Sequence, residues 1–87
     1  MTEKTTTIKN RAGIHARPAT MIVKEASKFQ SNVYIEKGSE KINAKSILNI
    51  LTLGGTYNSQ IKVIADGDDE VEAVDSLINL IDNKFEE

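Results

Sequence analysis

The sequence predicts an α+β fold: an open-faced β-sandwich with a four-stranded antiparallel sheet and three helices packed on one face. Two observations lead to this class. Residues 33–36 and 40–43 alternate in polarity like strands, and the Gly38-Ser39 pair between them favours a type II′ hairpin turn. Residues 16–28 and 70–85 instead carry apolar side chains at helical spacing. Short loops favour antiparallel pairing, which leaves the other sheet face to solvent.

The first strand and the first helix flank the most distinctive segment of the chain. Residues 3–8 are rich in threonine and read as a short strand, and residues 10–13 read as a loop. A helix is expected over residues 16–28, with Pro18 tolerated in its first turn because the amide it lacks would have no partner there. Its apolar stripe is Ala19, Ile22, Val23 and Ala26.

The second half of the chain predicts a short helix, a strand and a final helix. Ser46 is a favoured N-cap and Gly54 a favoured terminator, so a helix of barely two turns is expected between them. Residues 61–65 form the clearest strand, after a turn in which Asn58 can take the left-handed conformation. The final helix begins with acidic residues, which the helix dipole favours there. Its expected stripe is Val71, Val74, Leu77, Ile78 and Ile81, with Phe85 near the end.

The composition indicates one domain over residues 1–87. With no cysteine and one histidine, neither a disulfide nor a metal site is expected, and no cofactor is expected either. No apolar run approaches the roughly 20 residues of a membrane span, so no membrane insertion is expected. The N-terminus lacks an apolar signal segment, which favours a cytoplasmic location.

The net charge of −2 hides a strong asymmetry along the chain. Residues 1–65 carry ten Lys or Arg and four Asp or Glu, whereas residues 66–87 carry one and nine. The part that contains the histidine is therefore basic and suits acidic partners or phosphate. Direct binding of nucleic acid is not expected, because only two Phe and two Tyr are present to stack on bases.

His15 lies where the first helix should begin, near its N-cap. The positive end of the helix dipole disfavours imidazolium, so we expect a neutral, nucleophilic ring near neutral pH. The unpaired amides of Ala16 and Arg17, with the Arg17 guanidinium, can hold an anion attached to that ring. This pattern predicts a phosphorylatable histidine, although a lone histidine near a helix start is often only a cap or a surface residue.

The short helix carries more large aliphatic residues than one face can bury. Ile50 and Leu53 lie three positions apart and can point inward together. A second patch then remains, formed by Ile47, Leu48 and Leu51. Either a small domain needs all five residues for its core, or this aliphatic patch is exposed and marks a surface for a partner.

Four segments resemble landmarks of the HPr family, the histidine-containing phosphocarriers of the bacterial phosphoenolpyruvate-dependent sugar phosphotransferase system. Residues 13–19 (GIHARPA) match the active-site signature, and residues 43–47 (NAKSI) match the regulatory serine signature. Residues 52–54 (TLG) and 67–70 (GDDE) match later landmarks. The two signatures occur in the right order and separation, and the similarity covers nearly the whole chain.

The resemblance implies a phosphoryl carrier rather than an enzyme. Phosphorylated enzyme I would pass its phosphoryl group to Nδ1 of His15, and the carrier would donate it to the enzyme IIA domain of a sugar permease. Arg17 and the amides of Ala16 and Arg17 would stabilise the phosphoryl oxygens. A monomer is expected. The implied docking residues for the partners are Thr20, Lys24, Ile47, Leu48 and Leu51.

The resemblance also implies a regulatory role for Ser46. In family members that meet an HPr kinase/phosphorylase, this serine is phosphorylated from ATP or pyrophosphate. Phosphoserine adds about −1.5 to −2 charge, here at an N-cap beside the aliphatic patch. We expect weaker encounter with enzyme I and stronger engagement of a catabolite-control transcription factor, with the fold unchanged. The alternative is a plain N-cap, as in members without such a kinase.

Two departures from the family pattern stand out. Many members carry Ser or Asn where Ala12 stands, so no side chain at this position can orient the His15 ring by a hydrogen bond. Many carry Gly where Asn58 stands, which should be harmless for the turn. The HPr-like regulator Crh lacks the histidine, so the presence of His15 favours the carrier.

Two other functions stay open at this point. A nitrogen-related phosphotransferase relay would keep the histidine but would signal rather than feed sugar uptake. A regulatory protein-binding module would act through Ser46 and the aliphatic patch, without phosphoryl transfer.

Overall fold

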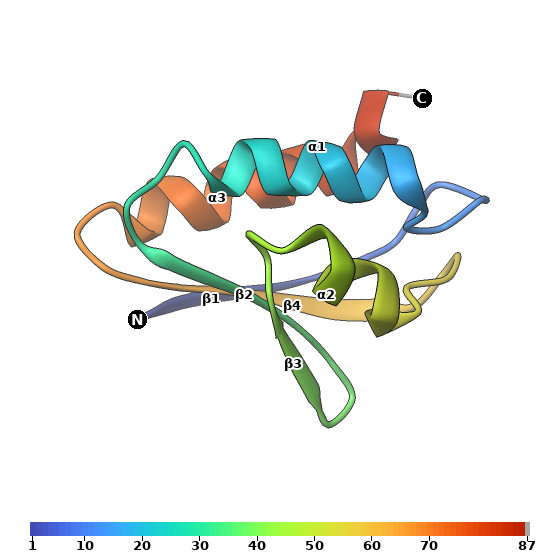
Figure 1. The fold of residues 1–87 in the computed structure, drawn as a ribbon, viewed down its shortest axis with the longest axis horizontal. Helices are drawn as coiled ribbons and strands as arrows, with labels where there is room; N and C mark the ends of the chain where they lie inside the picture. The colour runs from blue at the N-terminus through green and yellow to red at the C-terminus, as the bar shows by residue number, and fades with distance from the viewer. Residues whose placement is uncertain (87) are drawn as a thin grey trace.

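A computed structural model describes residues 1–86 of this chain, apart from the side chain of Glu86, and shows one sheet with helices on one side (Figure 1). The strands are β1 (Thr2–Thr7), β2 (Asn32–Lys37), β3 (Glu40–Asn43) and β4 (Gln60–Asp66). The helices are α1 (Ala16–Ala26), α2 (Ile47–Leu53) and α3 (Glu70–Asp82), followed by a 3₁₀ turn, Lys84–Glu86. The predicted open-faced α+β sandwich is confirmed. Within residues 1–86, no helix has the length and hydropathy needed to cross a membrane.

The four strands lie in the order β1-β4-β2-β3, and every neighbouring pair is antiparallel. The last strand, β4, is therefore central and pairs with β1, far away in sequence. The β2–β3 hairpin closes with Lys37 opposite Glu40, which leaves Gly38 and Ser39 as the turn. Gly38 has a φ of 61° whereas Ser39 keeps a negative φ, so the predicted type II′ turn is confirmed.

The core lies between the sheet and the three helices, while the outer sheet face carries charged side chains together with Ile64 and Tyr34. On that outer face, the Lys62 ammonium lies 3.7 Å from carboxylate oxygens of both Glu3 and Glu36. Among the largest fully buried side chains are Ile8, Ile22, Ile35, Ile50, Ile61, Leu77, Ile81 and Phe85.

Two helix ends differ from the expectation. Helix α1 stops at Ala26 rather than Lys28, because the amides of Lys28 and Phe29 bond to carbonyls three residues back, which tightens the chain into turns. Phe85 lies beyond α3, not within it. The chain takes a left-handed conformation at Lys84 and Phe85, with φ of 56° at each, and this reversal returns the Phe85 ring to the core.

The residues that α3 buries also differ from the apolar stripe predicted for it. Val71 was expected to be buried, but its side chain is 53% exposed. Glu70 takes the inward position of the first turn and bonds to the start of β1, so Val71 points to solvent. The buried residues of α3 are Ala73, Val74, Leu77 and Ile81.

Hydrogen bonds to carboxylates hold β1 against α3. Three side chains of β1 each donate a bond of 2.5 Å: Thr2 to Glu70, Lys4 to Asp75, and Thr6 to Asp82. The N-terminal amino group lies 2.9 Å from the carboxylate of Glu70. The Thr2 hydroxyl bond is the main cause that lowers the pKa of Glu70 to about 2. An edge strand with polar inward side chains is thus held by polar contacts.

Candidate functional site

His15 is the N-cap of α1, as predicted, and its side chain is exposed. Its backbone is extended, with φ of −113° and ψ of −162°, and its carbonyl accepts the first helical bond from the Ala19 amide at 2.9 Å. The imidazole makes no capping hydrogen bond within the described part of the chain. The ring is therefore presented to solvent at the electropositive end of a helix.

The first turn of α1 places a cation and two backbone amides beside the histidine. The amides of Ala16 and Arg17 precede any intrahelical acceptor, and Pro18 contributes none. Arg17 is exposed, and its Nη1 donates a 3.2 Å bond to Sδ of Met21 one turn later. Thr20 is exposed as well, and its hydroxyl donates to the Ala16 carbonyl at 2.9 Å. These groups lie together at the start of α1, where the sequence predicts that an anion is bound.

The loop before His15 is held by bonds that sequence reasoning missed. Asn10 is buried, with 2% of its surface exposed, and its Nδ2 donates a 2.6 Å bond to the Gly13 carbonyl. The Gly13 amide returns a 3.0 Å bond to the Asn10 carbonyl. The next amide, that of Ile14, donates to the Gly55 carbonyl at 2.8 Å. The only sequence signal for this turn is an asparagine three residues before a glycine, which is common in loops.

Ser46 caps the second helix, as predicted. Its backbone is extended, and its Oγ accepts a 3.3 Å bond from the Asn49 amide and a 3.0 Å bond from Asn49 Nδ2. Gly54 ends the helix in the left-handed conformation, with a φ of 71°. A helix of only seven residues is thus closed at both ends by local signals.

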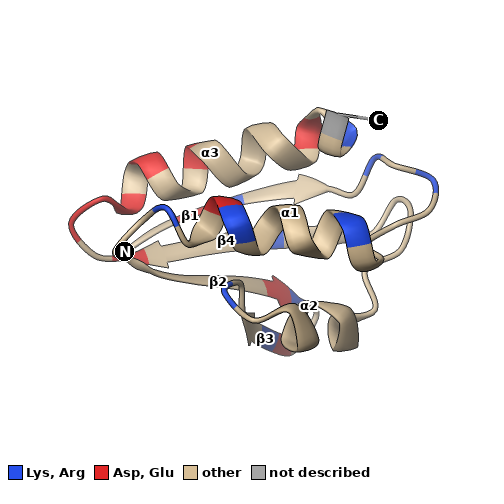
Figure 2. Cartoon of the chain, turned by 45° about the horizontal axis from the view of Figure 1, so that its top comes forward, with Lys and Arg blue, Asp and Glu red and all other residues tan. Residues whose placement is uncertain are grey.

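The aliphatic patch is exposed, so the core of this domain does not need all five aliphatic residues of α2. Leu48 is 71% exposed, and Ile47 and Leu51 are each 41% exposed, whereas Ile50 and Leu53 are buried. Helices α1 and α2 contact each other and lie side by side (Figures 1 and 2). The predicted docking residues on α1, Thr20 and Lys24, are exposed on the neighbouring helix. The five residues predicted for docking therefore lie on two adjacent helices.

His15 and Ser46 lie at opposite ends of this helix pair. The Ile14–Gly55 bond joins the start of α1 to the end of α2. At the other end, Nζ of Lys45 donates a 2.8 Å bond to the Phe29 carbonyl, just past α1. The two helices are thus antiparallel, and α1 alone spans about 16 Å at 1.5 Å per residue. Ser46 lies near the aliphatic patch and far from the imidazole.

The charges follow the asymmetry of the sequence. Figure 2 shows acidic residues along α3 and the turn before it, and basic residues on α1 and on the loop that precedes it. In that loop, the Arg11 guanidinium carbon lies 5.7 Å from the centre of the Tyr57 ring, a cation–π contact. The end of the molecule that carries His15 is therefore electropositive.

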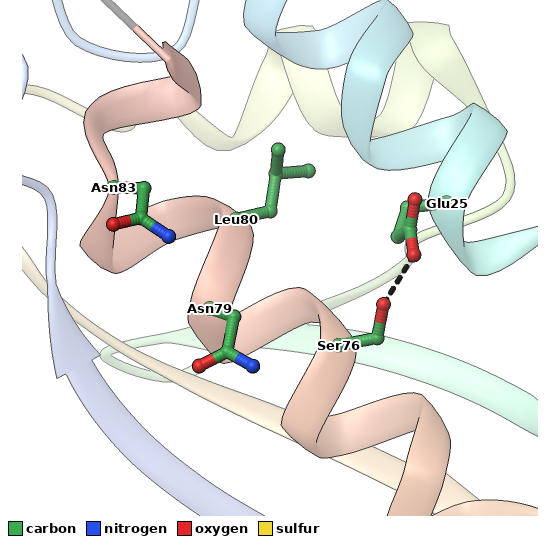
Figure 3. A pocket seen from close by; sticks show the side chains of 5 residues that line it. All are labelled: Glu25, Ser76, Asn79, Leu80 and Asn83. Atoms are coloured by element: carbon green, nitrogen blue, oxygen red, sulfur yellow. Dashed lines mark hydrogen bonds between the residues drawn. The ribbon is translucent and has the colours of Figure 1, made fainter.

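A shallow pocket of about 250 Å³ lies between α1 and α3 (Figure 3). It is lined by Glu25, Ser76, Asn79, Leu80 and Asn83. The Ser76 hydroxyl donates a hydrogen bond to the Glu25 carboxylate. This bond is the main cause that lowers the pKa of Glu25, and a hydrogen bond from Lys28 is the second cause. None of the predicted site residues lines the pocket, and Glu25 lies ten residues, or about 15 Å, along α1 from His15. The pocket is therefore separate from the histidine.

The fold and the site define a class of protein: a small sandwich that presents one imidazole to solvent at the tip of a helix. The family model described as "PTS HPr component phosphorylation site" matches residues 2–83. The chain belongs to this HPr family, and HPr is a phosphocarrier protein and not a catalytic enzyme.

Similar proteins support this assignment along the full chain. The phosphocarrier protein HPr of Treponema pallidum (strain Nichols) is 40% identical over 87 residues, which covers 100% of this chain and 99% of the relative. The HPr-like protein Crh of Halalkalibacterium halodurans is 42% identical over 84 residues, covering 97% and 100%.

Solved structures agree with the fold. HPr-C-His from Thermoanaerobacter tengcongensis has a TM-score of 0.96 and 49% identity, with 100% of this chain and 98% of that chain covered. A structure of an HPr dimer from the same organism has a TM-score of 0.80 and covers 100% of both chains. Because a dimer occurs among these structures, the monomer expected from the sequence stays a prediction.

Proposed function

We propose that this chain accepts a phosphoryl group from phosphorylated enzyme I on Nδ1 of His15 and donates it to the enzyme IIA domain of a sugar permease. The observation that supports this most strongly is the exposed His15 ring at the start of α1, which makes no capping bond in the described residues. In the forward step, the Nδ1 lone pair forms a bond to phosphorus while the bond from phosphorus to the donor breaks. The ring keeps its proton on Nε2. The reverse sequence delivers the group to enzyme IIA.

Arg17 and the first amides of α1 assist this exchange by stabilising negative charge. The phosphoryl oxygens gain charge-assisted hydrogen bonds from the guanidinium and from the amides of Ala16 and Arg17. These donors lie on an exposed surface, where water competes for them, so the bound group is held only moderately. Moderate binding suits a carrier, because strong stabilisation of the phosphorylated state would slow donation.

We further propose that phosphorylation of Ser46 regulates docking. Ser46 lies at the N-terminus of α2, next to Ile47 and Leu48, and it is separated from His15 by the length of α1. A phosphate there adds negative charge at a helix N-terminus, which is compatible with the fold. It also places that charge and its hydration beside the aliphatic patch. The expected effect is weaker encounter with enzyme I and a new surface for a catabolite-control transcription factor.

The carrier role is tested by incubation with phosphoenolpyruvate, magnesium and enzyme I. We expect one acid-labile phosphate on the wild type, none on His15→Ala, and full labelling of Asn79→Ala, a matched surface control on α3. Addition of an enzyme IIA domain should then remove the phosphate from the carrier. An unlabelled wild type, beside enzyme I that is itself labelled, would contradict the carrier role and favour a binding module.

The regulatory role is tested separately with ATP and an extract of the source cell. We expect acid-stable phosphate on the wild type and none on Ser46→Ala. Equal labelling of the two proteins would remove Ser46 as the modified residue.

A further inference from the structure

We infer that Asn10 is a positioning residue for phosphoryl transfer, because its buried amide fixes the peptide between Gly13 and Ile14, one residue before His15. The inference rests on the proposed function in one respect, which is that the positioned His15 ring accepts the phosphoryl group. The fixing of the ring itself is a structural statement about the loop at residues 10–14, and it can be measured without phosphate.

Asn10 binds the turn at residues 10–13 through both its backbone and its side chain. Its carbonyl accepts a 3.0 Å bond from the Gly13 amide, and its Nδ2 donates a 2.6 Å bond to the Gly13 carbonyl. Only 2% of the Asn10 surface is exposed, so water competes little for this second bond. The side chain therefore determines which way the Gly13 carbonyl points.

The peptide between Gly13 and Ile14 is consequently held at both of its polar groups. Its carbonyl is bound by Asn10, and its N–H, that of Ile14, is bound by the Gly55 carbonyl at 2.8 Å. Gly13 has a φ of 72°, and a Cβ there would lie 2.5 Å from the Gly55 oxygen, so the two loops are in close contact. Ile14, the residue before His15, is only 7% exposed and is anchored in the core.

The backbone is therefore held on both sides of His15. The Gly13–Ile14 peptide is held one residue before it, and the carbonyl of His15 itself accepts the 2.9 Å bond from the Ala19 amide. The ring makes no capping bond, and Ala12 has no polar side chain with which to orient it. Its direction then depends on the fixed Cα–Cβ bond, and a looser loop would spread the ring over more orientations. Misplacement of a reacting group by about 1 Å can cost on the order of 100-fold in rate.

The side-chain oxygen of Asn10 indicates that a contribution to stability alone does not explain why an asparagine stands at this position. Within the described residues, Oδ1 of Asn10 is buried without a hydrogen-bond partner. A buried acceptor without a partner is unfavourable for folding. What the amide supplies is the bond from Nδ2 to Gly13, and this bond acts on the orientation of the segment that carries His15.

The experiment compares Asn10→Leu, which keeps the approximate shape of the side chain but removes the donor, with the wild type. Asn10→Ala is the second variant if the leucine disturbs folding. Ile81→Val is the matched control, because it trims a fully buried side chain of α3 and leaves the hydrogen bonds of Asn10, Gly13 and Ile14 in place. The readouts are the NMR order parameter of the Ile14 amide, the three-bond couplings that report χ1 of His15, and kcat and KM for transfer from phosphorylated enzyme I.

We expect Asn10→Leu to lower the Ile14 order parameter, to average χ1 of His15 and to reduce kcat by about tenfold, with KM changed less than about twofold. Ile81→Val should change none of these. Unchanged NMR readouts, an unchanged kcat beside a phosphorylated wild type, or equal changes in Ile81→Val would overturn the inference. A wild type that takes no phosphate would instead overturn the proposed function.

Discussion

The amide of Ile14 donates a 2.8 Å hydrogen bond to the carbonyl of Gly55, which ties the loop before α1 to the loop after α2. Through this bond, the end of α1 that carries His15 is fixed relative to the helix that carries the aliphatic patch. A partner that binds the patch on α2 is then placed in a defined position relative to the imidazole. Docking and transfer can be separate properties of two neighbouring helices.

We predict that Gly13→Ala destabilises the protein far more than Gly38→Ala. Both glycines have positive φ, 72° and 61°, so both variants incur backbone strain of about 1–2 kcal/mol. Only at Gly13 would the new Cβ also meet another atom, the Gly55 oxygen at 2.5 Å, whereas nothing lies within 4 Å at Gly38. Urea unfolding measures the difference. Equal losses would mean that the contact between the two loops is easily relaxed.

We predict that Leu48→Ser weakens docking without affecting stability. Leu48 is 71% exposed, so the free energy of unfolding should change by no more than about 0.5 kcal/mol. The KM for phosphorylated enzyme I should rise roughly tenfold, which corresponds to about 1.4 kcal/mol of lost contact. Val71→Ser, at a 53% exposed residue of α3, is the control and should change neither quantity. A similar KM for all three proteins would exclude the aliphatic patch as the docking surface.

We predict that two substitutions of Ser46 differ in their effect on stability and on docking. Ser46→Ala removes the bond from the Asn49 amide and should cost about 1 kcal/mol in unfolding free energy. Ser46→Asp retains a capping oxygen and should stay close to the wild type. Its added charge should nevertheless raise the KM for phosphorylated enzyme I, which Ser46→Ala should not do. If Ser46→Asp docks like the wild type, a charge at this N-cap does not control encounter.

We predict that acid weakens the attachment of β1 to α3. The pKa of Glu70 is lowered from 4.5 to about 2, mainly by the Thr2 hydroxyl and then by the N-terminal amino group. A lowered carboxyl pKa contributes stability that is fully present above pH 4.5 and is lost as the pH falls from 4.5 through 2. Asp82, held by Thr6, shifts in the same direction.

The test of this pH dependence is unfolding by urea at several pH values between 7 and 2 for the wild type and Glu70→Gln. The variant should be less stable at pH 7 and should lose less stability on acidification. Parallel curves for the two proteins would show that Glu70 does not contribute to the acid sensitivity.

The elements predicted correctly from the sequence are those with local signals. The turn at Gly38 and Ser39, the N-cap at Ser46 and the terminator at Gly54 depend on residues next to one another in the chain. The same holds for His15, which is placed at the N-cap by the helical stripe that follows it. Exposure of the aliphatic patch needed the structure, because sequence alone does not show how much core a small domain requires.

The features that were missed depend on contacts between distant segments. The pairing of β1 with β4 joins the first strand to the last strand, and no local pattern specifies it. Val71 was misplaced because Glu70 bonds to β1, a contact that rotates the start of α3 relative to the expected stripe. Asn10 looked like an ordinary loop residue until its burial and its bond to Gly13 were seen.

The most direct measurement of the central claim is a long-range ¹H–¹⁵N NMR spectrum of the protein after phosphorylation by phosphoenolpyruvate and enzyme I. With a single histidine in the chain, its two ring nitrogens can be assigned without ambiguity. We predict that Nδ1 of His15 shifts and couples to phosphorus, while Nε2 stays protonated. A phosphorus coupling at Nε2, or phosphate on another residue with an unchanged imidazole, would contradict the claim.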